Sequence, residues 1–172
     1  MCDTGYTVKE LARDLRELKE RGLAEAEMLA ESAELVKRLV LMKHNWLRTH
    51  MTRPAPTPEE GPKRHVLHEE PDHSLALFVV AMNAGERTAA HDHGTWAVIA
   101  GLEGREVNRR WRREGDFVVP EGEDAIDDAT ILCLPGSTIH SLHNESDAAS
   151  VTLQLYGINP DHTQHRNYTP RR

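Results

Sequence analysis

Closely spaced turn residues divide the larger, C-terminal part of this 172-residue chain into short apolar runs. Roughly eight strand-length runs fit between Arg64 and Tyr156. The turns between them are rich in glycine, proline and asparagine: Asn83-Ala84-Gly85, Glu103-Gly104, Glu114-Gly115-Asp116, Pro120-Glu121-Gly122 and Pro135-Gly136. Many short strands at regular intervals are typical of a sandwich or a closed barrel. We therefore predict a mainly β fold, with a barrel over about residues 64–157.

The N-terminal part of the chain has a helical rather than a strand-like pattern. Thr7 and Glu10 fit a capping box at a helix start, and leucines follow at helical spacing until Gly22. A second pattern of the same period runs over about residues 23–47. We expect helices within about residues 7–47 that pack an apolar face on the sheet; the alternative is a surface for a partner.

A proline-rich segment joins the helical and β parts. Residues 54–62 contain four prolines, which exclude both a helix and a central strand. The helical part alone is too small to bury an independent core. We therefore interpret the segment as a connector within a single domain of residues 1–172, which ends in a C-terminal tail over residues 158–172.

Charge and cysteine content exclude several classes of protein. The formal net charge is −7 at pH 7, whereas a nucleic-acid-binding surface is basic. No apolar run reaches the roughly 18 residues that span a bilayer, and no secretion signal is visible at the N-terminus. Cys2 and Cys133 provide no disulfide framework, and Cys133, within an apolar run, is expected to be a buried, inert thiol. We expect a cytoplasmic protein that binds neither nucleic acid nor membrane; its oligomeric state is undetermined by the sequence.

Histidines in two separate stretches indicate a metal site. His91 and His93 are two residues apart in an extended segment, so their side chains project from the same side. His140 opens a later strand-like run and would be the third ligand, whereas its rival His143 has an odd spacing that places it on the opposite face. Imidazole suits iron, zinc, copper or nickel; a hydrogen-bonded pair of histidines at a strand end is the alternative. The remaining histidines are expected at the surface: His44, His50, His65, His68, His73, His162 and His165.

These histidine segments resemble the metal-binding motifs of cupins. The motifs read Gly85-x5-His91-x-His93, with Gly104 closing the next hairpin, and Pro135-Gly136 followed by His140-x3-Asn144. Where cupins usually carry a glutamate after the second histidine, this chain has Trp96 and Ala97. The three-histidine set is similar to that of the cysteine dioxygenase-like thiol dioxygenases. The resemblance covers roughly residues 64–157 and implies a cupin double-stranded β-helix, a jelly-roll-like barrel, with Fe²⁺ bound by His91, His93 and His140.

The same resemblance implies an activity and a substrate class. Both atoms of O₂ would be added to the sulfur of a small carboxylate-bearing thiol, such as 3-mercaptopropionate or cysteine, to produce a sulfinate. Two other interpretations stay open. One is a cupin dioxygenase or isomerase that acts on a non-thiol small molecule, and the other is a non-catalytic cupin that binds a metal or ligand.

Further site residues follow from the resemblance. The hydrogen-bonded Ser-His-Tyr triad of the family corresponds to Thr152, Gln154 and Tyr156, which strand alternation places on one face. These residues are the expected catalytic group, although glutamine replaces the imidazole at its centre. Arg64 would bind the substrate carboxylate through a bidentate pair, and Trp96 would be a second substrate contact.

Several other arginines are alternative anchors for a carboxylate: Arg87, Arg105, Arg109 and Arg110. The last two belong to the charged run from Arg109 to Arg113. A row of exposed charges is a common feature of strands that end a sheet, so we expect this run to form a solvated edge strand.

Overall fold

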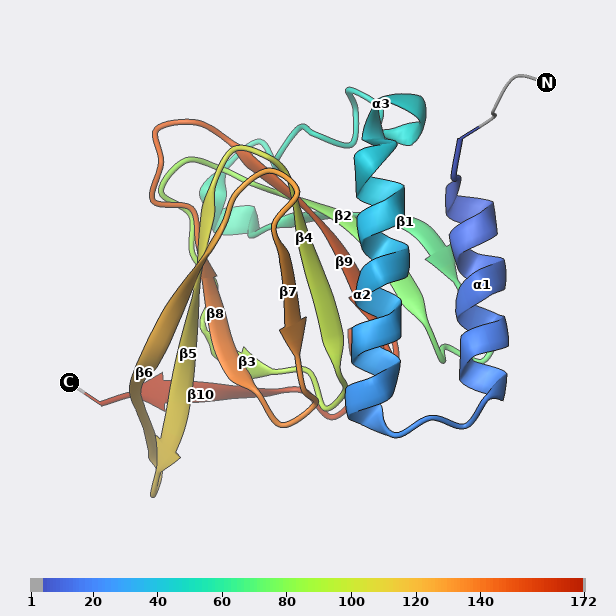
Figure 1. The fold of residues 1–172 in the computed structure, drawn as a ribbon. Coiled ribbons are helices and arrows are strands. Elements are labelled where there is room, and N and C mark those ends of the chain that lie inside the picture. Colours follow the sequence, from blue (N-terminus) through green and yellow to red (C-terminus); the bar gives the residue numbers. More distant parts are fainter. Residues whose placement is uncertain (1–4, 172) are drawn as a thin grey trace.

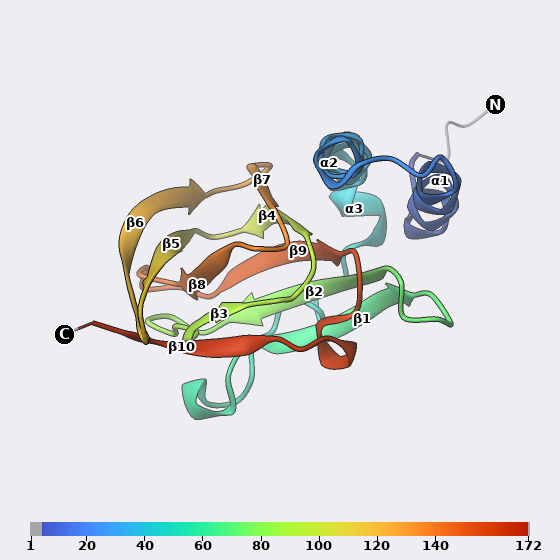
Figure 2. The ribbon, with the colours of Figure 1, turned by 90° about the horizontal axis from the view of Figure 1, so that it is seen from below.

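Two layers of β-sheet, with helices on one outer face, make up the computed structural model, which describes residues 5–171 (Figure 1). Helices α1 (Val8–Glu20) and α2 (Glu25–Leu41) lie side by side against one layer, as the view from below shows (Figure 2). Cys2 lies outside the described residues. The helices and the last strand are at opposite ends of the molecule (Figure 1).

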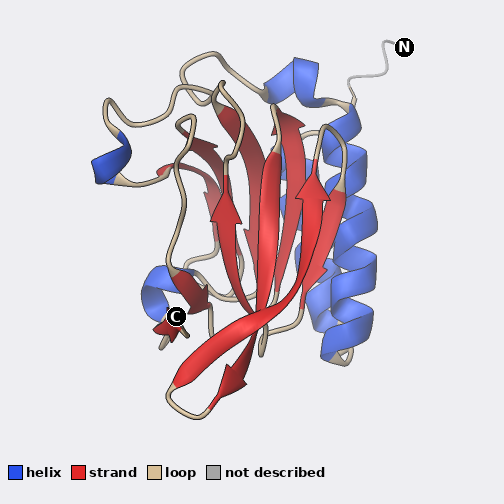
Figure 3. Ribbon diagram, turned by 90° about the vertical axis from the view of Figure 1, so that its left-hand side faces the viewer, coloured by secondary structure: helices blue, strands red, loops and turns tan. Residues whose placement is uncertain are grey.

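Short helices and the strands follow α2 along the chain; Figure 3 shows all helices in blue and all strands in red. The helices are α3 (Lys43–Trp46), the 3-10 helix η1 (Pro58–Glu60) and the 3-10 helix η2 (Pro160–His162). The strands are β1 (Lys63–Glu69), β2 (Ala76–Met82), β3 (Ala90–Asp92), β4 (Ala97–Glu103), β5 (Glu106–Glu114), β6 (Phe117–Ile126), β7 (Ile131–Leu134), β8 (Ile139–His143), β9 (Ser150–Tyr156) and β10 (Arg166–Pro170).

Strands from distant parts of the chain are neighbours in both sheets. The first sheet has the order β1-β2-β9-β4-β7, with antiparallel pairs throughout. The second has the order β10-β3-β8-β5-β6 and closes on itself, because β10 also pairs in parallel with β6. Closure removes free strand edges, which would otherwise be open to pairing with other chains. The predicted mainly β class with N-terminal helices is confirmed.

Alternation along the strands separates two apolar cores. In β2, Leu77 and Val79 face the helices, whereas Phe78 and Val80 face the space between the sheets. Leu153 in β9 belongs to the helix-facing core. Every residue of β2 and β9 is buried, because helices cover one face of these strands and the second sheet covers the other.

The helices begin and pack as amphipathic elements. At the start of α1, Oγ1 of Thr7 accepts from the amide of Glu10 at 3.3 Å, and Oε2 of Glu10 accepts from the amide of Thr7 at 2.8 Å. Helix α2 packs on β4 and β7 through buried residues that include Val36 and Leu39. Within residues 5–171, no helix combines the length and the apolar character that a bilayer crossing requires.

The structure differs from three expectations, in each case because of which strands pair. Within the expected C-terminal tail, residues Arg166–Pro170 form β10, which pairs with β3 and β6. The charged run of β5 is not an edge, because β5 pairs with both β6 and β8. Cys133 is exposed, because β7 pairs with β4 alone and ends the first sheet. The residues of a strand do not by themselves encode which strands lie next to it.

Candidate metal centre

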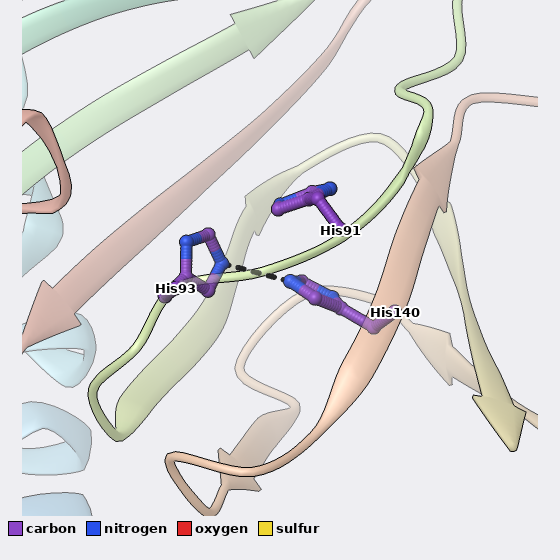
Figure 4. Close-up of side chains that lie close together, drawn as sticks. All are labelled: His91, His93 and His140. Atoms are coloured by element: carbon purple, nitrogen blue, oxygen red, sulfur yellow. Dashed lines mark hydrogen bonds between the residues drawn. The ribbon is translucent and has the colours of Figure 1, made fainter. Parts of the chain in front are cut away.

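Three imidazoles converge on the inner side of the second sheet (Figure 4). His91 in β3 is paired with His140 in β8, and His93 directly follows β3. The Nε2 atoms of His93 and His140 are 2.8 Å apart. The ring centres are separated by 4.7 Å for His91 and His93, 4.6 Å for His91 and His140, and 4.9 Å for His93 and His140. The pairing of β3 with β8 therefore brings the third histidine to the other two.

Burial keeps these imidazoles neutral. The exposed fraction is 1% for His140 and 9% for His93. Loss of hydration lowers the pKa of His93 to about 3 and also lowers the pKa of His91. The pKa of His140 falls well below its ordinary value, mainly through burial and also through the two neighbouring imidazoles. A neutral imidazole retains the lone pair that metal binding requires.

Hydrogen bonds orient two of the three rings. Nδ1 of His91 lies 2.9 Å from the carbonyl oxygen of Ala89. Nδ1 of His140 lies 2.7 Å from Oδ1 of Asn108, a fully buried residue of β5. Because a carbonyl oxygen only accepts, Nδ1 donates in both bonds, and Nε2 carries the free lone pair.

Asn108 is a site residue that the sequence analysis did not identify. Its side chain reaches His140 because β5 pairs with β8, where Asn108 stands opposite Leu142. This pairing joins distant segments, so no local sequence signal marks Asn108 as a residue of the site. A partner of this kind fixes the tautomer and the orientation of a metal ligand.

The donor set fits one divalent first-row metal ion. At metal–nitrogen distances of about 2.0–2.1 Å, two ligand atoms at right angles are about 3 Å apart, close to the 2.8 Å between His93 and His140. Within the described residues, no carboxylate belongs to this group. The nearby Asp92 accepts instead from the Arg166 amide and the Tyr168 hydroxyl. Three protein ligands leave coordination positions for small molecules.

A cavity of about 280 Å³ lies in front of the three imidazoles. Val80 and Leu142 contribute apolar wall, and Arg64 and Asp161 lie at the rim, where their side chains are 43% and 54% exposed. Nη2 of Arg64 is 3.0 Å from Oδ1 and 3.1 Å from Oδ2 of Asp161. The sequence analysis proposed Arg64 but not Asp161, which reaches the cavity on η2.

A chain of buried polar groups forms another part of the cavity wall. The hydroxyl of Tyr156 donates to Oε1 of Gln154 at 2.5 Å, and Nε2 of Gln154 donates to Oγ1 of Thr152 at 3.0 Å. Gln154 and Tyr156 line the cavity, but Thr152 does not. The Tyr156 ring centre is 4.8 Å from that of His93. Burial raises the pKa of Tyr156, so its hydroxyl stays protonated and can donate a hydrogen bond.

Other residues considered from the sequence lie elsewhere. Trp96 does not line the cavity, contrary to expectation; it packs with Val98 in the helix-facing core, where strand alternation places both side chains. His143, the rival ligand, lies outside the group, with Nε2 at 2.8 Å from the Ser141 hydroxyl. The alternative arginine anchors are also absent from the cavity wall: Arg87, Arg105, Arg109 and Arg110.

Comparison with known proteins supports the fold. No known family description matches the sequence, and no curated protein sequence matches it either. Among solved structures, TT1209 from Thermus thermophilus is 19% identical, with 63% of this chain and 91% of that chain covered and a TM-score of 0.51. The DMSP lyase DddQ from Ruegeria pomeroyi is also 19% identical, with coverages of 70% and 58% and a TM-score of 0.51. An oxalate oxidase in complex with the substrate analogue glycolate is 12% identical, with coverages of 66% and 59% and a TM-score of 0.50.

These similarities establish the cupin double-stranded β-helix for this chain. At such low identity they concern the fold alone, and one fold can carry many activities. The function must therefore be argued from the three imidazoles and the cavity in front of them.

Proposed function

We propose that this chain is an iron-dependent thiol dioxygenase that converts a small carboxylate-bearing thiol, such as 3-mercaptopropionate or cysteine, to its sulfinate. The observation that carries the proposal is a three-imidazole group that, among residues 5–171, includes no carboxylate, in a cavity that also contains an arginine. In the reaction RSH + O₂ → RSO₂H, both oxygen atoms are added to sulfur, so no further reductant is needed. Fe²⁺ held by His91, His93 and His140 would supply open positions for thiolate and dioxygen and lower the pKa of the thiol.

Arg64 is the residue proposed to bind the substrate carboxylate. Its guanidinium lines the cavity and already binds a carboxylate, that of Asp161. Only Nη2 of Arg64 contacts Asp161, whereas a substrate carboxylate that takes the place of Asp161 could form a planar pair with two guanidinium nitrogens. The guanidinium carbon of Arg64 also lies 5.5 Å from the ring centre of Phe78, which supports this position from the barrel wall.

Tyr156 is proposed to orient the substrate or the reacting oxygen through its hydroxyl. Gln154 accepts a hydrogen bond from the Tyr156 hydroxyl, and Thr152 in turn holds the Gln154 amide in place. The side-chain amide of Gln154 does not gain or lose a proton near neutral pH. Gln154 and Thr152 would therefore act by positioning Tyr156 through hydrogen bonds, not as a proton donor or acceptor. The cavity volume of about 280 Å³ suits a substrate of few non-hydrogen atoms.

Product analysis tests the proposed reaction directly. The protein is loaded with Fe²⁺ without oxygen and then incubated with single thiols under ¹⁸O₂. We expect oxygen consumption with a carboxylate-bearing thiol and a sulfinate that carries two labelled oxygen atoms, detected by mass spectrometry. A loaded protein that consumes no oxygen with any thiol, or a product with one labelled atom, contradicts the proposal.

Substitution of Arg64 tests the substrate class. Arg64→Gln should raise KM for a carboxylate-bearing thiol by about 10-fold or more, because a charge-assisted pair is lost, and should leave KM unchanged for an amine thiol that has no carboxylate. Arg113→Gln, at an exposed position of β5, is the matched control. Equal effects of Arg64→Gln on both thiols would assign Arg64 a structural role instead.

A further inference from the structure

A second group of metal-ligating side chains lies outside the cavity. Glu69 ends β1, His73 lies in the turn between β1 and β2, and His162 belongs to η2. One ligand atom of each residue lies within 4.8 Å of the others. The two imidazole rings are stacked, with their centres 3.5 Å apart and an angle of 8° between their planes. The fold thus brings ligands from two distant segments, the β1–β2 turn and η2, to one place.

A buried asparagine holds this group in position. Nδ2 of Asn159, a residue that is 5% exposed, donates to Oε1 of Glu69 at 2.6 Å. The same carboxylate oxygen is 2.7 Å from Nδ1 of His73, and the amide of Asn159 donates to the carbonyl oxygen of His73 at 2.9 Å.

The backbone of His73 adopts an uncommon conformation. Its φ is +61°, in the left-handed region that residues other than glycine rarely enter. Hydrogen bonds hold it there, because its amide donates to the carbonyl oxygen of Glu70 at 2.9 Å and its own carbonyl accepts from Asn159. This conformation places the imidazole beside His162. Backbone conformations of this kind concentrate at functional sites.

We propose that Glu69, His73 and His162 form a second metal site, which binds Zn²⁺ or an ion with similar ligand preferences. Two imidazoles and one carboxylate are an established donor set for zinc. Tetrahedral zinc places its nitrogen ligands about 3.4 Å apart, and the exposed His162 would rotate out of the stack to bind the ion. This proposal is independent of the proposed dioxygenase activity.

The position of this second site gives it a structural role. A bound ion would connect η2 to the turn between β1 and β2, in addition to the hydrogen bonds of Asn159. Asp161, next to His162, is the residue that pairs with Arg64 at the cavity rim. The site therefore holds the segment that carries one side of the rim.

Metal stoichiometry tests the second site without reference to activity. The full chain and its variants are dialysed against Zn²⁺, and bound zinc is measured by inductively coupled plasma mass spectrometry. We expect two ions per chain for the wild type and one for His73→Ala/His162→Ala. His140→Ala should also retain one ion. The control His44→Ala/His50→Ala removes two exposed imidazoles from another part of the surface and should retain two ions.

A conservative variant tests the role of the carboxylate. Glu69→Gln keeps an acceptor for Asn159 but loses the charge, and it should weaken zinc binding at the second site by about 10-fold or more. Equal numbers of bound ions in the wild type and in His73→Ala/His162→Ala would overturn the proposal. Loss of an ion from the His44→Ala/His50→Ala control would place the second ion elsewhere and overturn it equally. If His140→Ala does not fold, the comparison of the wild type with His73→Ala/His162→Ala still tests the proposal.

Discussion

The residues of the two sheets contribute differently to stability and to the candidate metal centre. In the first sheet, strands β2 and β9 are buried on both faces by the helices and by the opposite sheet. In the second sheet, β5 and β6 carry partly exposed ion pairs, such as Arg109 with Glu123 at 2.6 Å and Arg110 with Asp124 at 2.6 Å. The second sheet also supplies His140 and Asn108 to the metal centre. Packing is thus concentrated in one sheet and ligands in the other, so substitutions should separate stability from metal binding.

The largest expected effect is the loss of metal affinity when a histidine of the second sheet is replaced. His140→Ala removes one of the three proposed ligands and should lower Fe²⁺ affinity by more than about 100-fold, beyond the usual effect of an outer hydrogen-bond partner. His143→Ala, on the same strand but outside the group, should change the affinity little. Anaerobic titration with Fe²⁺ measures both, and circular dichroism verifies the fold. Similar affinities for the two variants would refute the ligand assignment.

In the first sheet, a substitution in the core should lower stability and leave metal affinity unchanged. Leu153→Ala truncates a fully buried side chain in the helix-facing core and should lower the free energy of unfolding by about 2–5 kcal/mol. Below the unfolding transition, its metal affinity should match that of the wild type. Leu41→Ala, at a side chain that is 61% exposed, should stay within about 0.5 kcal/mol of the wild type in urea unfolding. If Leu153→Ala also loses metal binding, the two sheets are not separable in this way.

A smaller, pH-dependent effect is expected where the sheets meet. Glu106 in β5 is fully buried and accepts from the Ser150 hydroxyl of β9 at 2.9 Å. Burial raises the pKa of Glu106 to about 7, from 4.5 in the unfolded chain. The folded state therefore binds more protons than the unfolded state between these values, and its stability falls as pH rises through this window. The loss between pH 5 and pH 8 is about 2–3 kcal/mol.

Glu106→Gln should remove this part of the pH dependence. The difference in unfolding free energy between wild type and variant, measured in urea at pH 5 and pH 8, isolates Glu106 from the buried histidines, whose lowered pKa values have the opposite effect. Glu103→Gln, which replaces an exposed carboxylate of the neighbouring strand β4, is the matched control. A wild-type curve and a Glu106→Gln curve that stay parallel would show that Glu106 does not titrate in this range.

The smallest expected effect tests how the second sheet orients its ligand. Asn108→Ala removes the acceptor for Nδ1 of His140 and should weaken Fe²⁺ binding by about 10–100-fold. Asn108→Asp keeps an acceptor at this position and should bind more tightly than Asn108→Ala. The same anaerobic titration measures both variants. Equal affinities for wild type and Asn108→Ala would mean that strand pairing alone positions His140.

Local regularities allowed part of the fold and of the site to be predicted. The helical and strand periods, the capping box at Thr7 and the alternation in β9 depend only on neighbouring residues. Alternation correctly places Gln154 and Tyr156 on one face, but the same rule directs Trp96 to the helices rather than to the cavity. The error arose because the residues around Trp96 do not show which face of the strand the helices cover.

The sequence by itself determined the N-terminal helices and the β character of residues 64–157, though not strand β10. It also indicated that His91 and His93 share one side of an extended segment, because steric and periodic effects act within a few residues. Tertiary structure decided that β3, β8 and β5 are neighbours, and thus that His140 and Asn108 complete the centre. Tertiary structure also decided that Asp161 pairs with Arg64. The two residues are far apart in the sequence, and no local pattern predicts this contact. Pairing between distant strands depends on how both sheets bury their apolar faces together, a property of the whole chain rather than of any segment.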